Sequence, residues 1–182
     1  APLEVATNKI VLVDSGLAST AASVAFEFNN NITSIGLSPA SSDADLAARS
    51  ITIQSINPAD GSIISKSYAA SNDINSTGDL AGTSNQFVLW YADETAFGST
   101  RFVEAINSVN GQGSGAATPT LAASKINASV FINQIAKGVD GNACTITYGS
   151  QISILQGQIL SMTSIVAGSG YPASTTFTNS AI

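Results

Sequence analysis

Residues 50–68 read Ser-Ile-Thr-Ile-Gln-Ser-Ile-Asn-Pro-Ala-Asp-Gly-Ser-Ile-Ile-Ser-Lys-Ser-Tyr, and this stretch decides the fold class. Apolar and polar residues alternate over 50–56, which is the pattern of a half-buried β-strand. Residues 57–61 then supply turn chemistry, because proline presets φ and Asp-Gly accepts a positive φ. Residues 62–68 return as a second strand, so the stretch predicts a β-hairpin.

The same strand pattern recurs on both sides of this hairpin. Val24, Phe26 and Phe28 fall on one face at period two. The one expected helix covers 41–49, with Ser42 as its N-cap. Residues 69–85 are expected to form a polar loop, and the Gly/Ser-rich residues 107–118 a mobile loop. The other expected strands cover 22–28, 32–37, 86–91, 100–106, 125–135, 143–148, 151–166 (with a bulge at Gly157) and 175–182. About ten strands with one short helix predict an all-β, jelly-roll-like sandwich.

The first fourteen residues form an apolar, extended segment with no helix cap. A strand at a chain end frays unless a sheet holds it, either its own or that of a neighbour. We therefore divide the chain into an N-terminal donor strand, 1–14, and a single β-sandwich domain, 15–182. Insertion into a second copy would be head-to-tail, so it would propagate. The candidate donor residues are Leu3, Val5, Ile10, Val11, Leu12 and Val13.

The composition narrows the classes of partner. The chain has 182 residues, of which 44% are apolar but only 10% are charged, and its net charge is −6. Nucleic acid and anionic membranes both require a cationic surface, so neither is expected as a partner. No apolar run reaches the ~18 residues that span a membrane. The natural small partner of this surface is a cation.

The sequence lacks the side chains of the common catalytic sites. It has no His, which excludes a Ser-His-Asp triad and removes the usual transition-metal ligand. The single Cys144 has no disulfide partner and is expected to be a small buried residue. Two carboxylates beside a cleft could still cleave glycans. The aromatic side chains for such a cleft are Tyr68, Trp90, Tyr91, Tyr148 and Tyr171, although core packing explains them as well.

Carboxylates in polar loops are the remaining chemical signal. Calcium prefers six to eight oxygen ligands from carboxylates, amides and backbone carbonyls. No loop has EF-hand spacing or carries enough ligands alone, so sites shared between subunits are expected. The candidate calcium ligands are Asp43, Asp45, Asp73, Asp79, Asp93, Glu94 and Asp140. Helix capping, turns and solvation explain single members of this set equally well.

Three sequons favour export from the cell. They are Asn31-Ile-Thr33, Asn75-Ser-Thr77 and Asn127-Ala-Ser129, which makes Asn31, Asn75 and Asn127 candidate glycosylation sites. The sequence begins at Ala rather than Met, as expected for a mature form whose signal peptide has been removed. We therefore expect an extracellular protein that can carry glycans.

The segments APLEVATNKIVLVDSGLAST, Asp43-Ala-Asp45 and QFVLWYADE resemble the cannula subunits of hyperthermophilic archaea. The resemblance covers the whole chain, although no short metal motif carries over residue by residue. It implies a secreted structural protein of hollow extracellular tubes, which polymerises with calcium by donor-strand complementation. It also implies a jelly-roll fold similar to that of the TasA-like fibre proteins.

Two other functions stay open at this point. The chain could be a secreted, calcium-stabilised β-sandwich module that binds a glycan through Trp90 and nearby tyrosines. It could also be a glycan-cleaving enzyme that uses two carboxylates, although the structural subunit is the preferred hypothesis and no catalytic residue is assigned.

Overall fold

The computed structural model describes residues 21–28, 34–137 and 144–151, and the backbone of three further strands. Side chains of residues 95–97 are outside this description. The elements, in chain order, are β1 (Lys9–Val13), β2 (Ala21–Phe28), α1 (Asp43–Ala48), β3 (Ser50–Ile56), β4 (Ile63–Ser71), β5 (Leu80–Ala81), β6 (Phe87–Tyr91), α2 (Thr95–Ile106), β7 (Leu121–Ile126), β8 (Ser129–Lys137), β9 (Thr145–Tyr148), β10 (Ile159–Met162) and β11 (Ser174–Thr178).

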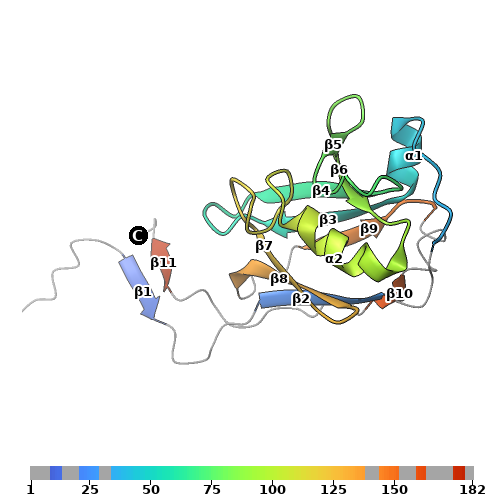
Figure 1. The fold of residues 1–182 in the computed structure, drawn as a ribbon. Helices are drawn as coiled ribbons and strands as arrows, with labels where there is room; N and C mark the ends of the chain where they lie inside the picture. Colours follow the sequence, from blue (N-terminus) through green and yellow to red (C-terminus); the bar gives the residue numbers. More distant parts are fainter. Residues whose placement is uncertain are drawn as a thin grey trace, which may run out of the picture.

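Two β-sheets face each other and form the body of the protein (Figure 1). One sheet has the strand order β10-β2-β8-β7, and the other has the order β5-β6-β4-β3-β9. All strand pairs within them are antiparallel except β4 with β6, which is parallel. The fold is therefore all-β in class, as the alternating sequence pattern predicts.

The predicted hairpin lies at the centre of the second sheet. β3 and β4 pair from Ser50 with Ala69 to Ile56 with Ile63. Asn57 accepts the Gly61 N–H and donates its own N–H to Ser62, which closes the turn. The predicted strands at 22–28 and 86–91 are confirmed as β2 and β6, and the predicted helix is confirmed as α1.

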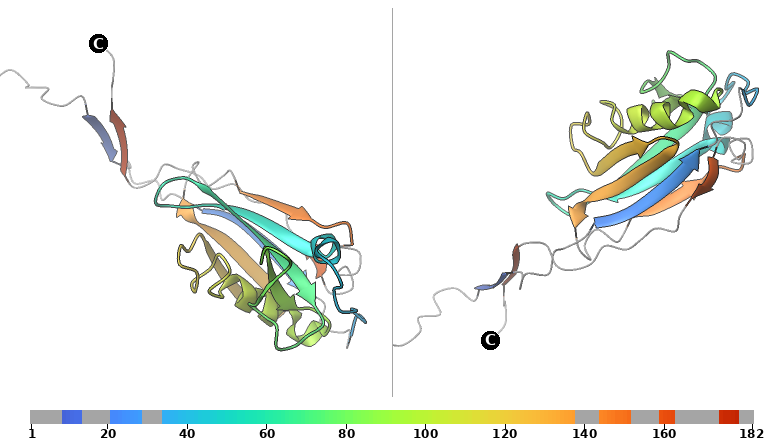
Figure 2. Two further views of the ribbon diagram at one scale, coloured as in Figure 1. Left: turned by 90° about the horizontal axis from the view of Figure 1, so that it is seen from above. Right: turned by 60° about the horizontal axis from the view of Figure 1, so that its bottom comes forward.

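An aromatic cluster fills the space between the two sheets. Phe102 of α2 lies at its centre, with ring centroids 5.6 Å from Phe26, 6.0 Å from Phe28, 5.9 Å from Tyr68 and 5.0 Å from Trp90. All five side chains are 1% exposed or less. Helix α2 contacts β6 and β7, and so it closes one side of the sandwich (Figure 2).

The predicted strand over 100–106 is wrong, because this segment is the second half of α2. Phe102 and Ile106 alternate as strand residues would, but Ala105 is also fully buried. Burial at positions i, i+3 and i+4 is the pattern of one helix face. The described part of the chain thus has two helices where the sequence predicted one.

The predicted long strand over 125–135 is also wrong, because a tight turn divides it. β7 ends at Ile126, β8 begins at Ser129, and these two residues face each other across the hairpin. Asn127 has a φ of 53°. Asparagine tolerates this left-handed conformation better than most residues, so it can turn the chain here.

The remaining differences concern loops and strand ends. Residues 34–37 are not in a strand, so the expected return strand over 32–37 is not formed in its described part. Residues 107–118 are held by internal hydrogen bonds and by the buried Gln112, which contrasts with the predicted mobile loop. β9, β10 and β11 lie within or overlap the strands expected near 143–148, 151–166 and 175–182, and Gly157 lies outside the described residues.

Candidate functional site

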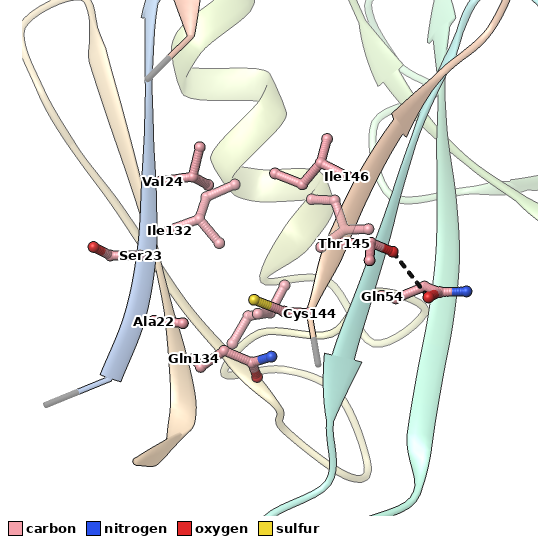
Figure 3. Close-up of a pocket in the computed structure, with 11 residues that line it drawn as sticks. Ala22, Ser23, Val24, Gln54, Ile132, Gln134, Cys144, Thr145 and Ile146 are labelled. Atoms are coloured by element: carbon pink, nitrogen blue, oxygen red, sulfur yellow. Dashed lines mark hydrogen bonds between the residues drawn. The ribbon is translucent and has the colours of Figure 1, made fainter. Parts of the chain in front are cut away.

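A narrow apolar slot lies between the two sheets, near β9. β2 and β8 form one wall and β3 and β9 form the other, and Val24 and Ile132 face Ile146 across the gap (Figure 3). Its free volume is about 20 Å³, which holds a methyl group or a water molecule but no sugar ring. The lining residues are Ala22, Ser23, Val24, Ile53, Gln54, Leu121, Ile132, Gln134, Cys144, Thr145 and Ile146.

Strand periodicity aims the apolar lining residues into the slot. In β2 the even-numbered residues are buried while the odd-numbered ones are partly exposed. In β8 the residues Val130, Ile132, Gln134 and Ala136 are buried in the same way. Since successive side chains of a strand point to opposite faces, one face of each strand makes the wall.

Gln134 is the exception among these inward-facing side chains, because it is polar. It is 4% exposed, and its Oε1 accepts the Ile56 backbone N–H at 3.2 Å. This bond fixes the amide orientation, because a backbone N–H requires an acceptor. The Gln134 Nε2 is buried and has no hydrogen-bond partner among the described residues. A buried unpaired donor is costly, so it favours a group that supplies an acceptor.

Cys144 lies at the lower end of the slot in Figure 3, close to Gln134. Its side chain is partly exposed, which differs from the small buried residue that the sequence predicts. It is also the single cysteine of the chain. A thiol at this place reports directly on access to the slot.

The slot is close to two sheet edges. Among the described strands, β9 pairs with β3 alone and ends the five-stranded sheet, while β10 pairs with β2 and ends the four-stranded sheet. Figure 2 shows both strands on the side of the sandwich away from α2. An edge strand has unpaired backbone groups that can accept another strand.

The N-terminal strand lies apart from both sheets. β1 pairs antiparallel with β11, from Lys9 with Thr178 to Val13 with Ser174 (Figures 1 and 2). A two-stranded ribbon is marginally stable in water unless something covers it. Among the candidate donor residues, Ile10, Val11, Leu12 and Val13 are in β1, whereas Leu3 and Val5 lie outside the described residues.

The acidic residues of α1 bind groups of the protein itself. The Asp43 carboxylate accepts the Thr83 N–H at 3.0 Å. Asp45 accepts the Ser41 N–H at 3.0 Å and the Ser41 hydroxyl at 2.5 Å. The bond from the Ser41 hydroxyl, followed by that from its N–H, lowers the pKa of Asp45. Asp45 thus supports the N-terminus of α1, as the capping explanation predicts, whereas Asp43 binds the connection between β5 and β6 and does not cap the helix.

The other candidate ligands are spread over separate loops. Asp73 accepts the Asn75 N–H at 2.9 Å, and Asp93 accepts the Leu37 N–H at 2.6 Å. Glu94 is hydrogen-bonded to the Tyr91 side chain, and the pKa of Tyr91 is raised first by burial and then by this bond. Asp79 is exposed. Asp140 lies outside the described residues, within which no three acidic, Cys or His side chains are grouped to hold a metal.

The aromatic residues considered for glycan binding are mostly in the core. Tyr68 and Trp90 are fully buried and Tyr91 is 5% exposed, so none of the three offers a ring face for stacking. Tyr148 of β9 is 39% exposed, and Tyr171 is outside the described residues.

Two of the three sequons lie on the described surface. Asn75 is exposed in the loop before β5, and Asn127 is exposed at the β7–β8 turn. Asn31 lies outside the described residues. An exposed acceptor amide satisfies the first requirement for a glycan.

Sequence reasoning missed Gln134, although a signal for it was present. Val130 and Ile132 predict the inward face of this strand, and Gln134 follows them in the same phase. A polar side chain at a core position of a strand requires a hydrogen-bond partner, so this position could have been singled out from the sequence.

Comparisons with known protein families, with curated proteins and with solved structures give no match. Neither helix in the described part of the chain has the length and apolar character needed to cross a membrane. The class defined so far is therefore a two-sheet all-β protein with an apolar slot at one edge.

Proposed function

We propose that this protein is the structural subunit of an extracellular hollow tube of the cannula type. Subunits join head-to-tail when the N-terminal strand of one copy enters the edge of another, and calcium bridges acidic groups across the joint. The protein is secreted, and its full domain is a jelly-roll-like sandwich. No catalytic residue is required.

The unpaired Gln134 donor in the apolar slot is the observation that carries this proposal. A strand entering beside β9 would bring backbone carbonyls, one of which can accept from the Gln134 Nε2. Its apolar side chains would extend the wall made by Val24, Ile132 and Ile146. Main-chain hydrogen bonds then supply affinity, while the side-chain positions set the register.

The segment that enters is residues 1–14 of a second copy. This segment carries Leu3 and Val5 at period two and a continuous apolar run over 10–13, and β1 lies outside both sheets of its own chain. Because β1 is held by β11 alone in the described structure, its exchange breaks a ribbon rather than the core. The donor and acceptor surfaces differ, so the assembly grows as a filament.

Calcium would act between subunits rather than within one. The described carboxylates of one chain do not gather into a three-residue site, and several already accept hydrogen bonds from backbone N–H groups of the same chain. The net charge of −6 makes subunits repel one another, and a bridging cation removes that repulsion. The exposed Asp73 and Asp79 are candidates for such a bridge.

The acceptor slot is tested with two substitutions in β2. Ala22→Leu fills the slot, whereas Ala25→Leu adds the same volume to the opposite face of the strand. Trp90 fluorescence checks that both variants fold. We expect filaments by electron microscopy with calcium for the wild type and for Ala25→Leu, but none for Ala22→Leu.

Three further measurements test the donor strand and the slot separately. Deletion of residues 1–12 should abolish filaments, and Cys144 should react with iodoacetamide more slowly in the filament than in the monomer. A synthetic peptide of residues 1–14 should protect Cys144 in the truncated protein, whereas a scrambled peptide should not. Equal Cys144 reactivity in monomer and filament, or normal filaments from the truncated chain, would refute donor-strand exchange at this slot.

A further inference from the structure

Arg49, which follows α1 directly, is a buried cation without a counter-ion in the described part of the chain. Its side chain is 5% exposed. Nη1 donates to the Ser38 carbonyl at 2.7 Å, but the buried Nε has no partner. No described carboxylate oxygen lies within 4.0 Å of the guanidinium nitrogens. The one ion pair among the described residues joins Arg101 to Glu104.

This arrangement is unfavourable for the folded protein alone. A guanidinium removed from water loses solvation, and it regains that free energy only from acceptors or an opposite charge. Burial accordingly lowers the pKa of Arg49, while the charge of Asp45 opposes the shift. One backbone carbonyl does not satisfy five N–H donors.

The two acidic side chains that line the surroundings of Arg49, Asp43 and Asp45, already accept hydrogen bonds. Asp45 binds both the N–H and the hydroxyl of Ser41. Asp43 accepts the Thr83 N–H and, at 3.4 Å, the Gln86 amide. These bonds hold both carboxylates in place, so neither is available to turn toward Arg49.

Two hollows adjoin the Arg49 side chain. The first has a volume of about 340 Å³ and has Ser41, Ser42 and Asn72 among its polar lining residues. The second, of about 290 Å³, is lined by Asp45 and Gln151 among others. Arg49 lines both hollows, and its Nε is buried behind them.

We propose that Arg49 and the first hollow bind a carboxylate group. A planar carboxylate matches the fork of N–H donors of arginine, and Ser42 and Asn72 add neutral polar groups around it. A phosphate dianion fits less well, because Asp43 in the wall of this hollow would repel it. The site is separate from the slot at β9 and does not depend on donor-strand exchange.

The carboxylate has two possible sources, a small free acid or an acidic side chain of a second copy. Both present the same chemistry to Arg49, and the chain itself carries twelve Asp and Glu residues. The experiment therefore has two parts. The binding arm tests whether Arg49 binds a carboxylate, and the source arm tests whether that carboxylate belongs to a free acid or to a second copy of the chain.

The binding arm uses the arginine Nε–Hε signals in an ¹⁵N NMR spectrum. The chain has two arginines, so Arg101→Lys assigns both signals and Arg101 is the internal control. The Arg101 Nε is also buried without a partner, but its Nη1 already binds Glu104 at 2.8 Å. Acetate should shift the Arg49 signal with saturation and leave Arg101 nearly unchanged. Sodium chloride at equal ionic strength should shift neither signal.

Arg49→Lys keeps the charge but loses the fork, so acetate should bind it about tenfold more weakly, as followed by backbone shifts around 41–43 and 70–72. If acetate moves both arginine signals alike, or moves neither, the proposal is wrong. This readout on the wild-type chain holds even if the lysine variant does not fold.

The source arm measures filament growth, so this arm alone rests on the proposed function, whereas the binding arm does not. If Arg49→Lys slows growth and acetate slows wild-type growth, the carboxylate comes from a second copy. If growth is unchanged in both cases while the NMR shift persists, the ligand is a free acid. A shift with inorganic phosphate that exceeds the shift with acetate would overturn the assignment to carboxylates.

Discussion

The Gln112 side chain should be a major determinant of stability, because it fastens the loop 107–118 to both central strands. It is fully buried. Its Nε2 lies within hydrogen-bond distance of the Ile53 carbonyl (3.2 Å), the Ser55 hydroxyl (2.7 Å) and the Ile64 carbonyl (3.0 Å). Its Oε1 accepts the Tyr68 hydroxyl at 3.1 Å.

The substitution Gln112→Leu keeps the volume nearly constant and removes all of these bonds. Two donated bonds and one accepted bond are worth about 1 kcal/mol each, and the buried Tyr68 hydroxyl also loses its acceptor. We expect a loss of about 3–4 kcal/mol in the free energy of unfolding. Gln86→Leu, at an exposed position, should change it by less than about 0.5 kcal/mol.

Urea denaturation followed by fluorescence of the buried Trp90 measures this change. A double-mutant cycle with Tyr68→Phe isolates the hydroxyl bond. In the wild type Tyr68→Phe should cost about 1 kcal/mol, whereas after Gln112→Leu it should be neutral or stabilising, because it removes an unpaired hydroxyl. If Gln112→Leu stays within about 1 kcal/mol of wild type, or Tyr68→Phe costs the same in both backgrounds, the reasoning is refuted.

Three further predictions follow from the core and the β7–β8 turn. Phe102→Ala should lower the free energy of unfolding by about 3–5 kcal/mol, whereas Phe131→Ala, 36% exposed, should cost far less in the same denaturation assay. Asn127→Ala should cost about 1 kcal/mol and Asn127→Gly almost nothing, because residue 127 has a φ of 53°; equal costs would contradict this. Burial raises the pKa of Tyr68 far above its ordinary value, so the folded state favours the neutral hydroxyl. The stability that this neutral hydroxyl contributes is complete below the unfolded pKa of about 10. Stability should therefore fall as the pH rises above about 10, and Tyr68→Phe should reduce the slope of urea midpoint against pH; an unchanged slope would argue against it.

The sequence determined the parts of the fold that depend on local periodicity. Alternation over 50–56 and the turn at 57–61 predict β3, β4 and their connection, and the structure has them there. The alternation of Val24, Phe26 and Phe28 likewise predicts the buried face of β2. These features depend on side-chain direction along a single strand, which residue order fixes.

The tertiary structure decided where local patterns allow two answers. Residues 100–106 satisfy a strand pattern and a helix pattern at once, and the choice depends on Phe102 reaching four aromatic neighbours from other elements. The composition of the Gly/Ser-rich loop predicts a mobile segment, but Gln112 donates to backbone carbonyls of β3 and β4 and so fixes the loop. Contacts between residues far apart in the chain override weak local preference.

The slot at β9 and the hollow at Arg49 likewise depend partly on sequence and partly on tertiary structure. The acidic residues and the apolar N-terminal strand are visible in the sequence, and so is a polar Gln134 in an apolar phase. The sheets and loops that pack around Gln134 and Arg49 decide the rest. They leave Gln134 with an unpaired donor beside the slot, and they bury Arg49 without a carboxylate partner among the described residues. Residue order fixes what each side chain can bind, but only packing determines which bonds are left unmade.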